Sequence, residues 1–161
     1  MIRWEMDGFF SQCIETFDKL AQANGYTPSK TKRPVTHPSI DDHQIPPEDF
    51  EEAGKLAKDA AKIVMKLLYG CRFVRFDYLW PCGDLARKIS KWTKACDRRM
   101  DRLIDHLRST KDHALEGFLG DTADQCHVVA YCDASFADDL ATSKSTSGFY
   151  LAIVVPTRLC Q

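Results

Sequence analysis

Apolar residues recur every three or four positions through most of the first 111 residues, which is the period of an α-helix with one buried face. The pattern predicts a first helix from about Asp7 to Asn24, ended by Gly25. Its apolar stripe, which we assign to the core rather than to a binding face, consists of Phe9, Phe10, Cys13, Ile14, Phe17, Leu20 and Ala21. From Tyr26 to Pro47, five prolines and little periodicity predict an extended, mostly solvated connector.

A second helix is predicted to begin near Pro47 or Glu48. Proline suits the first turn of a helix, and acidic side chains favour the positive end of the helix dipole. Gly70 is expected to end or interrupt this helix, because glycine is a poor residue for a helix interior. The predicted buried face consists of Leu56, Ala60, Ile63, Val64, Leu67 and Leu68.

Two more helices follow in the predicted pattern. Asp77 is the expected cap of a third helix that runs to about Trp92, with Pro81 in its first turn, where a missing N–H costs little. Thr93 is the expected cap of a fourth helix. One side of that helix is apolar and carries Cys96, Met100, Leu103, Ile104 and Leu107.

After Ser109-Thr110 the apolar period changes to two, which is the period of a β-strand. From His127 to Phe136 one face is apolar, and Asp133 and Ser135 share the other face. Residues 148–155 are apolar on both faces, as expected of a covered interior strand. A carboxylate in such a sheet loses hydration, which is costly unless a cation or hydrogen bonds compensate.

The predicted fold class is therefore α+β, with a small helical bundle followed by a β-hairpin. We divide the chain into an N-terminal helix (1–25), a proline-rich linker (26–47), a helical segment (48–111) and a β unit (112–161). The length of 161 residues allows one ordinary domain, or one domain and a piece of another.

Charge is distributed unevenly, although the net charge is only −1. Residues 84–111 contain nine Lys and Arg against four Asp, whereas residues 112–143 contain seven Asp and Glu with no Lys or Arg. Such asymmetry suggests a polyanion partner on one side and a cation site on the other. The candidate phosphate contacts are Lys91, Lys94, Arg98, Arg99 and Arg102.

An ordinary solvated face is the alternative interpretation of these cations. Asp97, Asp101 and Asp105 lie at helical spacing from neighbouring arginines and would pair with them. The residues alone favour this alternative, and the family resemblance described below makes the two interpretations about equal.

Composition excludes several other classes of protein. No apolar run reaches 18 residues, so we expect no membrane span. The charged N-terminus and seven irregularly spaced cysteines favour an intracellular protein with reduced thiols, in the cytoplasm or the nucleus. Cys126 and His127 are adjacent and have no second pair of ligands nearby in the sequence, which disfavours a zinc site.

Two motifs in the β unit resemble the start of the ribonuclease H domain in copia-type retrotransposon Pol polyproteins. They are Asp133-Ala-Ser-Phe-Ala137 and Lys144-Ser-Thr-Ser-Gly148. Upstream segments resemble, in order, the connection between reverse transcriptase and ribonuclease H in that family: Leu67-Leu-Tyr-Gly70, Arg75-Phe-Asp-Tyr-Leu79, Leu85-Ala-Arg87 and Leu103-Ile-Asp-His-Leu-Arg-Ser-Thr110. The resemblance covers most of the chain and is best from Leu67 to Val154.

The resemblance implies cleavage of the RNA strand of an RNA–DNA hybrid by two Mg²⁺ ions held in a carboxylate cluster. Asp133 matches the first carboxylate of that cluster, and Ser135 would contact the backbone of the hybrid. We assign Asp138 and Asp139 to a solvated turn rather than to metal binding. The later acidic ligands of the family lie beyond Gln161, so we expect Mg²⁺ to bind weakly if at all and the fragment alone not to hydrolyse RNA.

Two further hypotheses stay open. The chain could be a non-enzymatic helical interaction module that self-associates through the edges and apolar faces of its two-stranded hairpin. It could also be a decayed gene copy whose product is barely folded.

Overall fold

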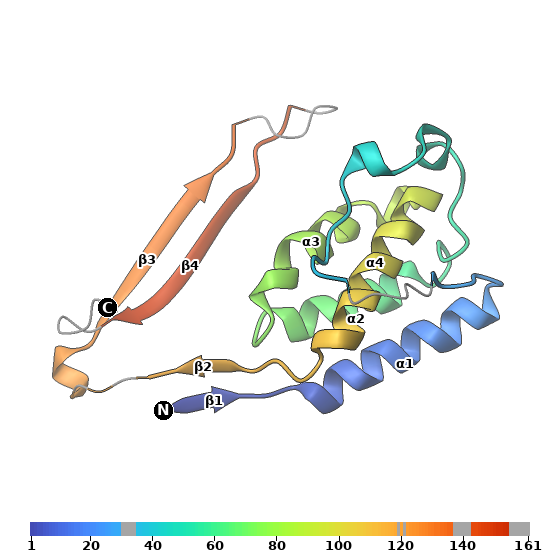
Figure 1. The fold of residues 1–161 in the computed structure, drawn as a ribbon. Helices are drawn as coiled ribbons and strands as arrows, with labels where there is room; N and C mark the ends of the chain where they lie inside the picture. Colours follow the sequence, from blue (N-terminus) through green and yellow to red (C-terminus); the bar gives the residue numbers. More distant parts are fainter. Residues whose placement is uncertain (30–34, 119, 121, 137–142, 155–161) are drawn as a thin grey trace. The chain divides into compact units, whose positions relative to one another are not determined.

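The computed structural model describes residues 1–29, 35–118, 120, 122–136 and 143–154 (Figure 1). The chain divides into two compact units. The helical unit comprises residues 2–116, and the hairpin unit comprises residues 117–161 together with Met1. The fold is therefore α+β, as predicted, and the predicted Asp138, Asp139 and the tail 155–161 lie outside the described residues.

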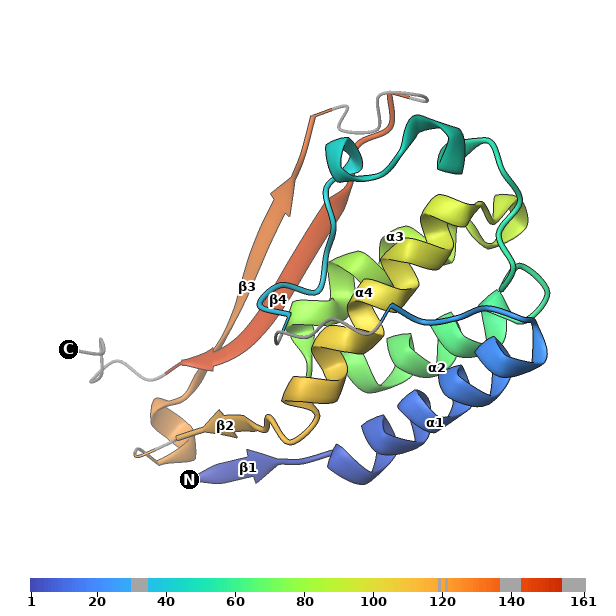
Figure 2. The same cartoon turned by 45° about the vertical axis from the view of Figure 1, so that its right-hand side comes forward.

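Helix α1 (Asp7–Ala23) begins at the predicted residue and lies beside α2 (Ala60–Cys71) in both views (Figures 1 and 2). Helix α2 begins some twelve residues later than the sequence predicted. A single 3₁₀ turn, Pro47–Phe50, occupies the predicted start. The N–H groups of Lys55 and Leu56 donate to a side chain of α4 instead of to a preceding helical turn. A helix that began at Pro47 would need these N–H groups for its own backbone hydrogen bonds, so it cannot run through this segment.

Gly70 is the second-last residue of α2, so the helix ends one residue after the predicted position. A Cβ at this position would be 2.7 Å from Phe9 Cε1 and 2.9 Å from Phe10 Cε1. Those rings belong to α1, so the glycine is required by the close approach of the two helices rather than by a helix end.

The connector after α1 is less solvated than predicted. Val35 and Ile45 are buried, and a 3₁₀ turn forms at Asp42–Gln44. The prolines keep this segment out of an α-helix, but its apolar side chains still leave water.

The predicted third helix is divided into a 3₁₀ turn at Phe76–Tyr78, α3 (Leu79–Arg87) and a second 3₁₀ turn at Ile89–Lys91. Asp77 makes no capping hydrogen bond. Its carboxylate instead accepts two hydrogen bonds from the buried guanidinium of Arg75, at 2.7 and 3.0 Å. The Arg75–Asp77 pair replaces the predicted cap because a bidentate bond between arginine and a carboxylate is stronger than a capping bond to a neutral N–H.

Helix α4 (Lys94–Thr110) begins after Thr93, as predicted, although the Thr93 side chain makes no capping bond to the backbone. A buried network fixes the other end of α4. Arg75 Nη1 donates to the Thr110 carbonyl at 2.6 Å, and the Tyr78 hydroxyl is 2.5 Å from His106 Nδ1. The guanidinium at the end of α4 also complements the helix dipole.

The four helices bury one core, in which α1 contacts α2 and α4, and α3 contacts α2 and α4. The buried faces predicted for α1, α2 and α4 supply most of it. The core consists of Phe10, Cys13, Ile14, Phe17, Ala21, Leu56, Ala60, Ile63, Val64, Leu67, Cys71, Tyr78, Cys82, Leu85, Trp92, Cys96, Met100, Leu103, Ile104 and Leu107. Among the described residues, no helix is both long and apolar enough to cross a membrane.

Within the described residues, four strands form two separate two-stranded sheets. Strands β1 (Ile2–Trp4) and β2 (Leu115–Gly117) pair with each other and were not predicted, because three residues are too few to show a period. Strands β3 (His127–Ala134) and β4 (Ser147–Val154) form the predicted antiparallel hairpin (Figure 1).

Candidate nucleic-acid interface

The hairpin brings the two resembling motifs together. In the β3–β4 register Asp133 lies opposite Gly148, and Ala134 lies opposite Ser147. Because side chains alternate along a strand, Asp133 and Ser135 point to one face of the hairpin. The ring of Tyr131 is on the same face, 6.4 Å from the ring of its cross-strand partner Tyr150.

Asp133 is exposed, which corrects the prediction of a buried acid. Its Oδ1 accepts a hydrogen bond of 2.9 Å from the N–H of Ala134. Strand β4 was predicted to be a covered interior strand, but its side chains are exposed or half-buried. The reason is that a two-stranded sheet has no further layer of its own to cover an apolar face.

Ser135 closes the open end of the described hairpin. Its N–H donates to the Thr146 carbonyl at 2.9 Å, and its hydroxyl oxygen accepts from the Thr146 N–H at 3.0 Å. The hydroxyl is exposed but occupied by these backbone contacts. A contact with nucleic acid would have to share the Ser135 hydroxyl with the Thr146 backbone.

The described residues do not fit a two-ion magnesium site. Among them, no group of three or more His, Cys, Asp or Glu side chains is close enough to hold a metal ion. One exposed carboxylate binds Mg²⁺ weakly and cannot hold two ions. Asp133 therefore has no clustered carboxylate partner within this part of the chain.

Most of the predicted phosphate contacts on α4 meet protein acceptors. Lys94 Nζ lies 2.8 Å from Asp49 Oδ1 and 3.0 Å from a carboxylate oxygen of Glu52, and Arg98 also pairs with Asp49. Asp49 is buried, and the Lys94 ammonium, followed by the Arg98 guanidinium, holds the pKa of its carboxyl below the usual range. These cations hold the 3₁₀ turn at Pro47–Phe50 against α4.

The remaining predicted contacts are divided between protein and solvent. Arg99 pairs with Asp42 and lies 3.8 Å from Asp84, and Arg102 donates to the His37 carbonyl at 3.0 Å. The Lys91 side chain is exposed. Nucleic-acid binding by the five α4-region cations stays a prediction, with which these internal contacts compete.

The aspartates of α4 have a different role from the surface pairing considered for them. Asp97 is only 1% exposed, and its carboxylate accepts hydrogen bonds from Trp92 Nε1 at 2.6 Å, the Lys55 N–H at 2.6 Å and the Leu56 N–H at 3.2 Å. Asp101 is 6% exposed and accepts from the Ser29 N–H at 2.7 Å. Nothing in the local sequence signals their burial, because Asp105 also follows a buried apolar residue and is only half-buried.

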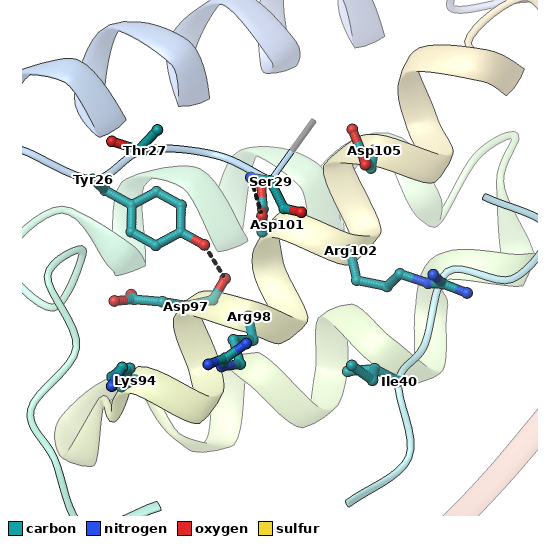
Figure 3. A pocket seen from close by; sticks show the side chains of 10 residues that line it. All are labelled: Tyr26, Thr27, Ser29, Ile40, Lys94, Asp97, Arg98, Asp101, Arg102 and Asp105. Carbon is teal, nitrogen blue, oxygen red and sulfur yellow. Dashed lines mark hydrogen bonds between the residues drawn. The ribbon is translucent and has the colours of Figure 1, made fainter. Parts of the chain in front are cut away.

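A cavity of about 350 Å³ adjoins these aspartates (Figure 3). Residues 26–29, Ile40 and α4 supply the lining, and Figure 3 shows the Tyr26 hydroxyl directed at the backbone carbonyl of Asp97. Burial is the main cause of the raised pKa of Asp101 and of Tyr26. Sequence reasoning did not identify this cavity, because nothing in the sequence shows that the connector returns to α4.

The charges that line the cavity are mixed. Lys94, Arg98 and Arg102 lie along α4 beside Asp97, Asp101 and Asp105. A phosphate in the cavity would therefore meet carboxylates as well as cations, which weakens the attraction. The cavity is a poorer polyanion site than the count of basic residues indicated.

Comparison with known proteins gives no relative: no protein-family model, no curated protein and no solved structure matches this chain.

Proposed function

We propose that this chain is a nucleic-acid-binding segment related to the copia-type retrotransposon Pol polyprotein. It spans the connection between reverse transcriptase and ribonuclease H and the first hairpin of ribonuclease H. Its partner is an RNA–DNA hybrid or another nucleic acid, and it does not cleave RNA by itself. The proposal begins from the motif resemblance described above.

The observation that supports the proposal best is the β3–β4 register. The two motifs that carry the resemblance are adjacent in space, with Asp133 opposite Gly148. Asp133 is exposed and points to the same face as Tyr131, so a nucleic-acid backbone or base has access to both. The hairpin supplies one acidic ligand of a metal site, and the other ligands would come from outside the described residues.

The test is binding of a fluorescein-labelled RNA–DNA hybrid, followed by fluorescence anisotropy between about 50 and 200 mM salt. We expect the logarithm of the binding constant to fall linearly with the logarithm of the salt concentration, by about one for each phosphate contact. The same hybrid incubated with Mg²⁺ should remain uncleaved with the wild-type chain and with Asp133→Asn.

Two results would contradict this function in different ways. Failure to bind any nucleic acid at low salt removes nucleic-acid binding from the proposal. Cleavage by the wild type that Asp133→Asn abolishes shows instead that the chain holds a complete nuclease site. An exposed carboxylate-to-amide change leaves the fold intact, so the variant isolates the chemistry.

Self-association through the hairpin is the second candidate, and it has a specific observation in its favour. Large apolar side chains of β3 and β4 are exposed on the face opposite Asp133. They are Val128, Phe149, Leu151 and Ile153. Exposed apolar strands favour pairing with another chain.

A further inference from the structure

The exposed side of α2 combines aromatic and basic side chains. Helical spacing, continued through the turn that follows α2, places on one side six residues, which we call the α2 outer face: Lys62, Met65, Lys66, Tyr69, Arg72 and Phe73. Arg72 and Phe73 belong to that turn, directly after the last helical residue. The opposite side of α2 is buried in the core. All six residues belong to the helical unit, so the face is defined within one compact body.

The aromatic rings of the α2 outer face are open to solvent. Tyr69 is 56% exposed and Phe73 is 54% exposed. Their ring centroids are 5.2 Å apart, and Tyr69 is in turn 5.6 Å from the ring of Phe9 on α1. The three rings form a continuous patch that packing holds in place, although more than half of the Tyr69 and Phe73 surface stays outside the core.

The cations of this face are available, in contrast to most of those on α4. Within the described ranges, neither Lys62 nor Arg72 forms a salt bridge, and both side chains are exposed. Lys66 Nζ donates to Thr16 Oγ1 at 3.2 Å and lies 5.9 Å from the centre of the Phe9 ring. Lys66 is half-buried, and its Nζ also donates to the Gln12 carbonyl at 3.5 Å. None of these three partners carries a formal negative charge, so the positive charge of Lys66 is not neutralised by them.

We propose that the α2 outer face is a binding platform for single-stranded nucleic acid. Bases stack on Tyr69 and Phe73, while Lys62, Lys66 and Arg72 contact the phosphates. This inference rests on the proposed function, and it moves the nucleic-acid contact from the predicted α4 cations to α2.

The chemistry of the face favours a single strand over other partners. In a duplex the bases are already stacked on each other, so they offer no free surface to Tyr69 or Phe73. An apolar protein partner would have to desolvate the three cations around the rings, which is unfavourable without matching acids. An unpaired strand supplies both the negative charge that the three cations attract and flat surfaces that stack on the rings.

The experiment measures binding of a fluorescein-labelled oligothymidylate of about 15 nucleotides to the full chain at low salt. Tyr69→Ala and Phe73→Ala should each weaken binding by about 5- to 100-fold. This is the effect expected when alanine replaces the aromatic side chain on which one base stacks. Lys62→Glu should weaken binding and reduce its salt dependence. Lys91→Glu makes the same charge change among the predicted α4-region phosphate contacts and therefore tests the competing site.

A conservative variant separates stacking from folding. Tyr69→Phe keeps the ring and should bind as the wild type does, whereas Tyr69→Ala should not. Circular dichroism of each variant checks that α2 remains folded. Lys62 is exposed and forms no ion pair within the described ranges, so Lys62→Glu keeps the test decisive even if an alanine variant unfolds.

The outcomes distinguish this inference from the proposed function. Loss of binding in Lys62→Glu but not in Lys91→Glu supports both. Loss in Lys91→Glu alone overturns the α2 platform and leaves nucleic-acid binding at the α4 cations. Absence of binding by the wild type to single strand and hybrid alike overturns both, and equal binding of strand and duplex overturns the single-strand preference.

Discussion

The carboxylate of Asp97 connects three parts of the helical unit. It accepts one hydrogen bond from the Trp92 indole and two from the backbone that precedes α2. Gly54 lies against the same group, and a Cβ on it would be 2.5 Å from the Thr93 carbonyl and 2.9 Å from Asp97 Oδ1. A buried acceptor with three donors is costly to replace, because each donor loses its partner away from water.

Asp101 lies one turn further along α4, and burial dominates its ionisation. Burial is the largest influence on its pKa and raises it, and the nearby Asp105 raises it further. A raised pKa in the folded state favours the protonated acid, so the stabilising contribution of this group is complete below its unfolded pKa of about 3.9. That contribution is lost as the pH rises through the folded pKa.

These two residues give a matched pair of variants on one helix. Asp97→Asn should lower the free energy of unfolding at pH 7 by about 2–3 kcal/mol, because an amide nitrogen would face an N–H donor. Asp101→Asn should leave it unchanged or raise it, because Asn still accepts from Ser29 and carries no buried charge. Urea unfolding followed by circular dichroism measures both.

The pH dependence provides the control for that interpretation. Any advantage of Asp101→Asn over the wild type should shrink as the pH falls toward 4, where the wild-type acid becomes protonated. A loss of stability in Asp101→Asn as large as that in Asp97→Asn would show that its charge is needed, contrary to the burial argument.

At the level of elements, two helical glycines should respond in opposite ways to alanine. Gly70 in α2 faces the Phe9 and Phe10 rings. At Gly83 in α3, nothing in the described part of the chain lies within 4 Å of the Cβ position, apart from its chain neighbours and the backbone of its own helix. Gly83→Ala should raise the free energy of unfolding by about 0.5–1 kcal/mol, the helix-propensity difference. Gly70→Ala should lower it by about 1–3 kcal/mol, because the methyl group overpacks the α1–α2 contact.

Thermal and urea unfolding of both variants, beside the wild type, would check this pair. Because both substitutions add one methyl group within a helix, propensity alone predicts the same gain for each. An equal gain would therefore show that α1 and α2 are not as closely packed as the distances at Gly70 indicate.

The elements that the sequence predicted correctly are those whose own periodicity determines them. The apolar stripes of α1 and α4 and the alternation in β3 are local properties, and these elements begin where they were predicted. Helix α1 ends one residue and β3 two residues before the predicted end. The start of α2 was wrong because it depends on a distant residue: Asp97 takes the N–H groups of Lys55 and Leu56. No local pattern reports such a contact.

In the candidate site, too, local patterns predicted some features correctly, while features that depend on distant contacts were missed. The pairing of Asp133 with the Gly148 segment followed from two strand patterns and a short connection. The exposure of Asp133 did not follow, because burial depends on what covers the sheet rather than on the strand itself. The partners of Arg99 and Arg102, from residues 37–42, were likewise set by tertiary structure.

For the whole molecule, the core of the helical unit is complete within its own sequence. Every residue of that core lies between Phe10 and Leu107, and β1 pairs with β2 at the two ends of the unit. We therefore expect residues 1–116 to fold alone, with a cooperative urea transition and the helical circular-dichroism signal of the full chain. The unfolding free energy of this fragment should be within about 1 kcal/mol of that of the helical unit in the full chain.

Comparison of the fragment with the full chain also decides the second candidate function. Removal of residues 117–161 removes the exposed apolar side chains of β3 and β4, so any self-association through them should disappear in the fragment. Sedimentation of the full chain, the fragment and Leu151→Lys over a range of concentrations measures this. If the full chain associates while the fragment and Leu151→Lys stay monomeric, the hairpin is the contact. Association that persists in the fragment would place the contact on the helical unit instead.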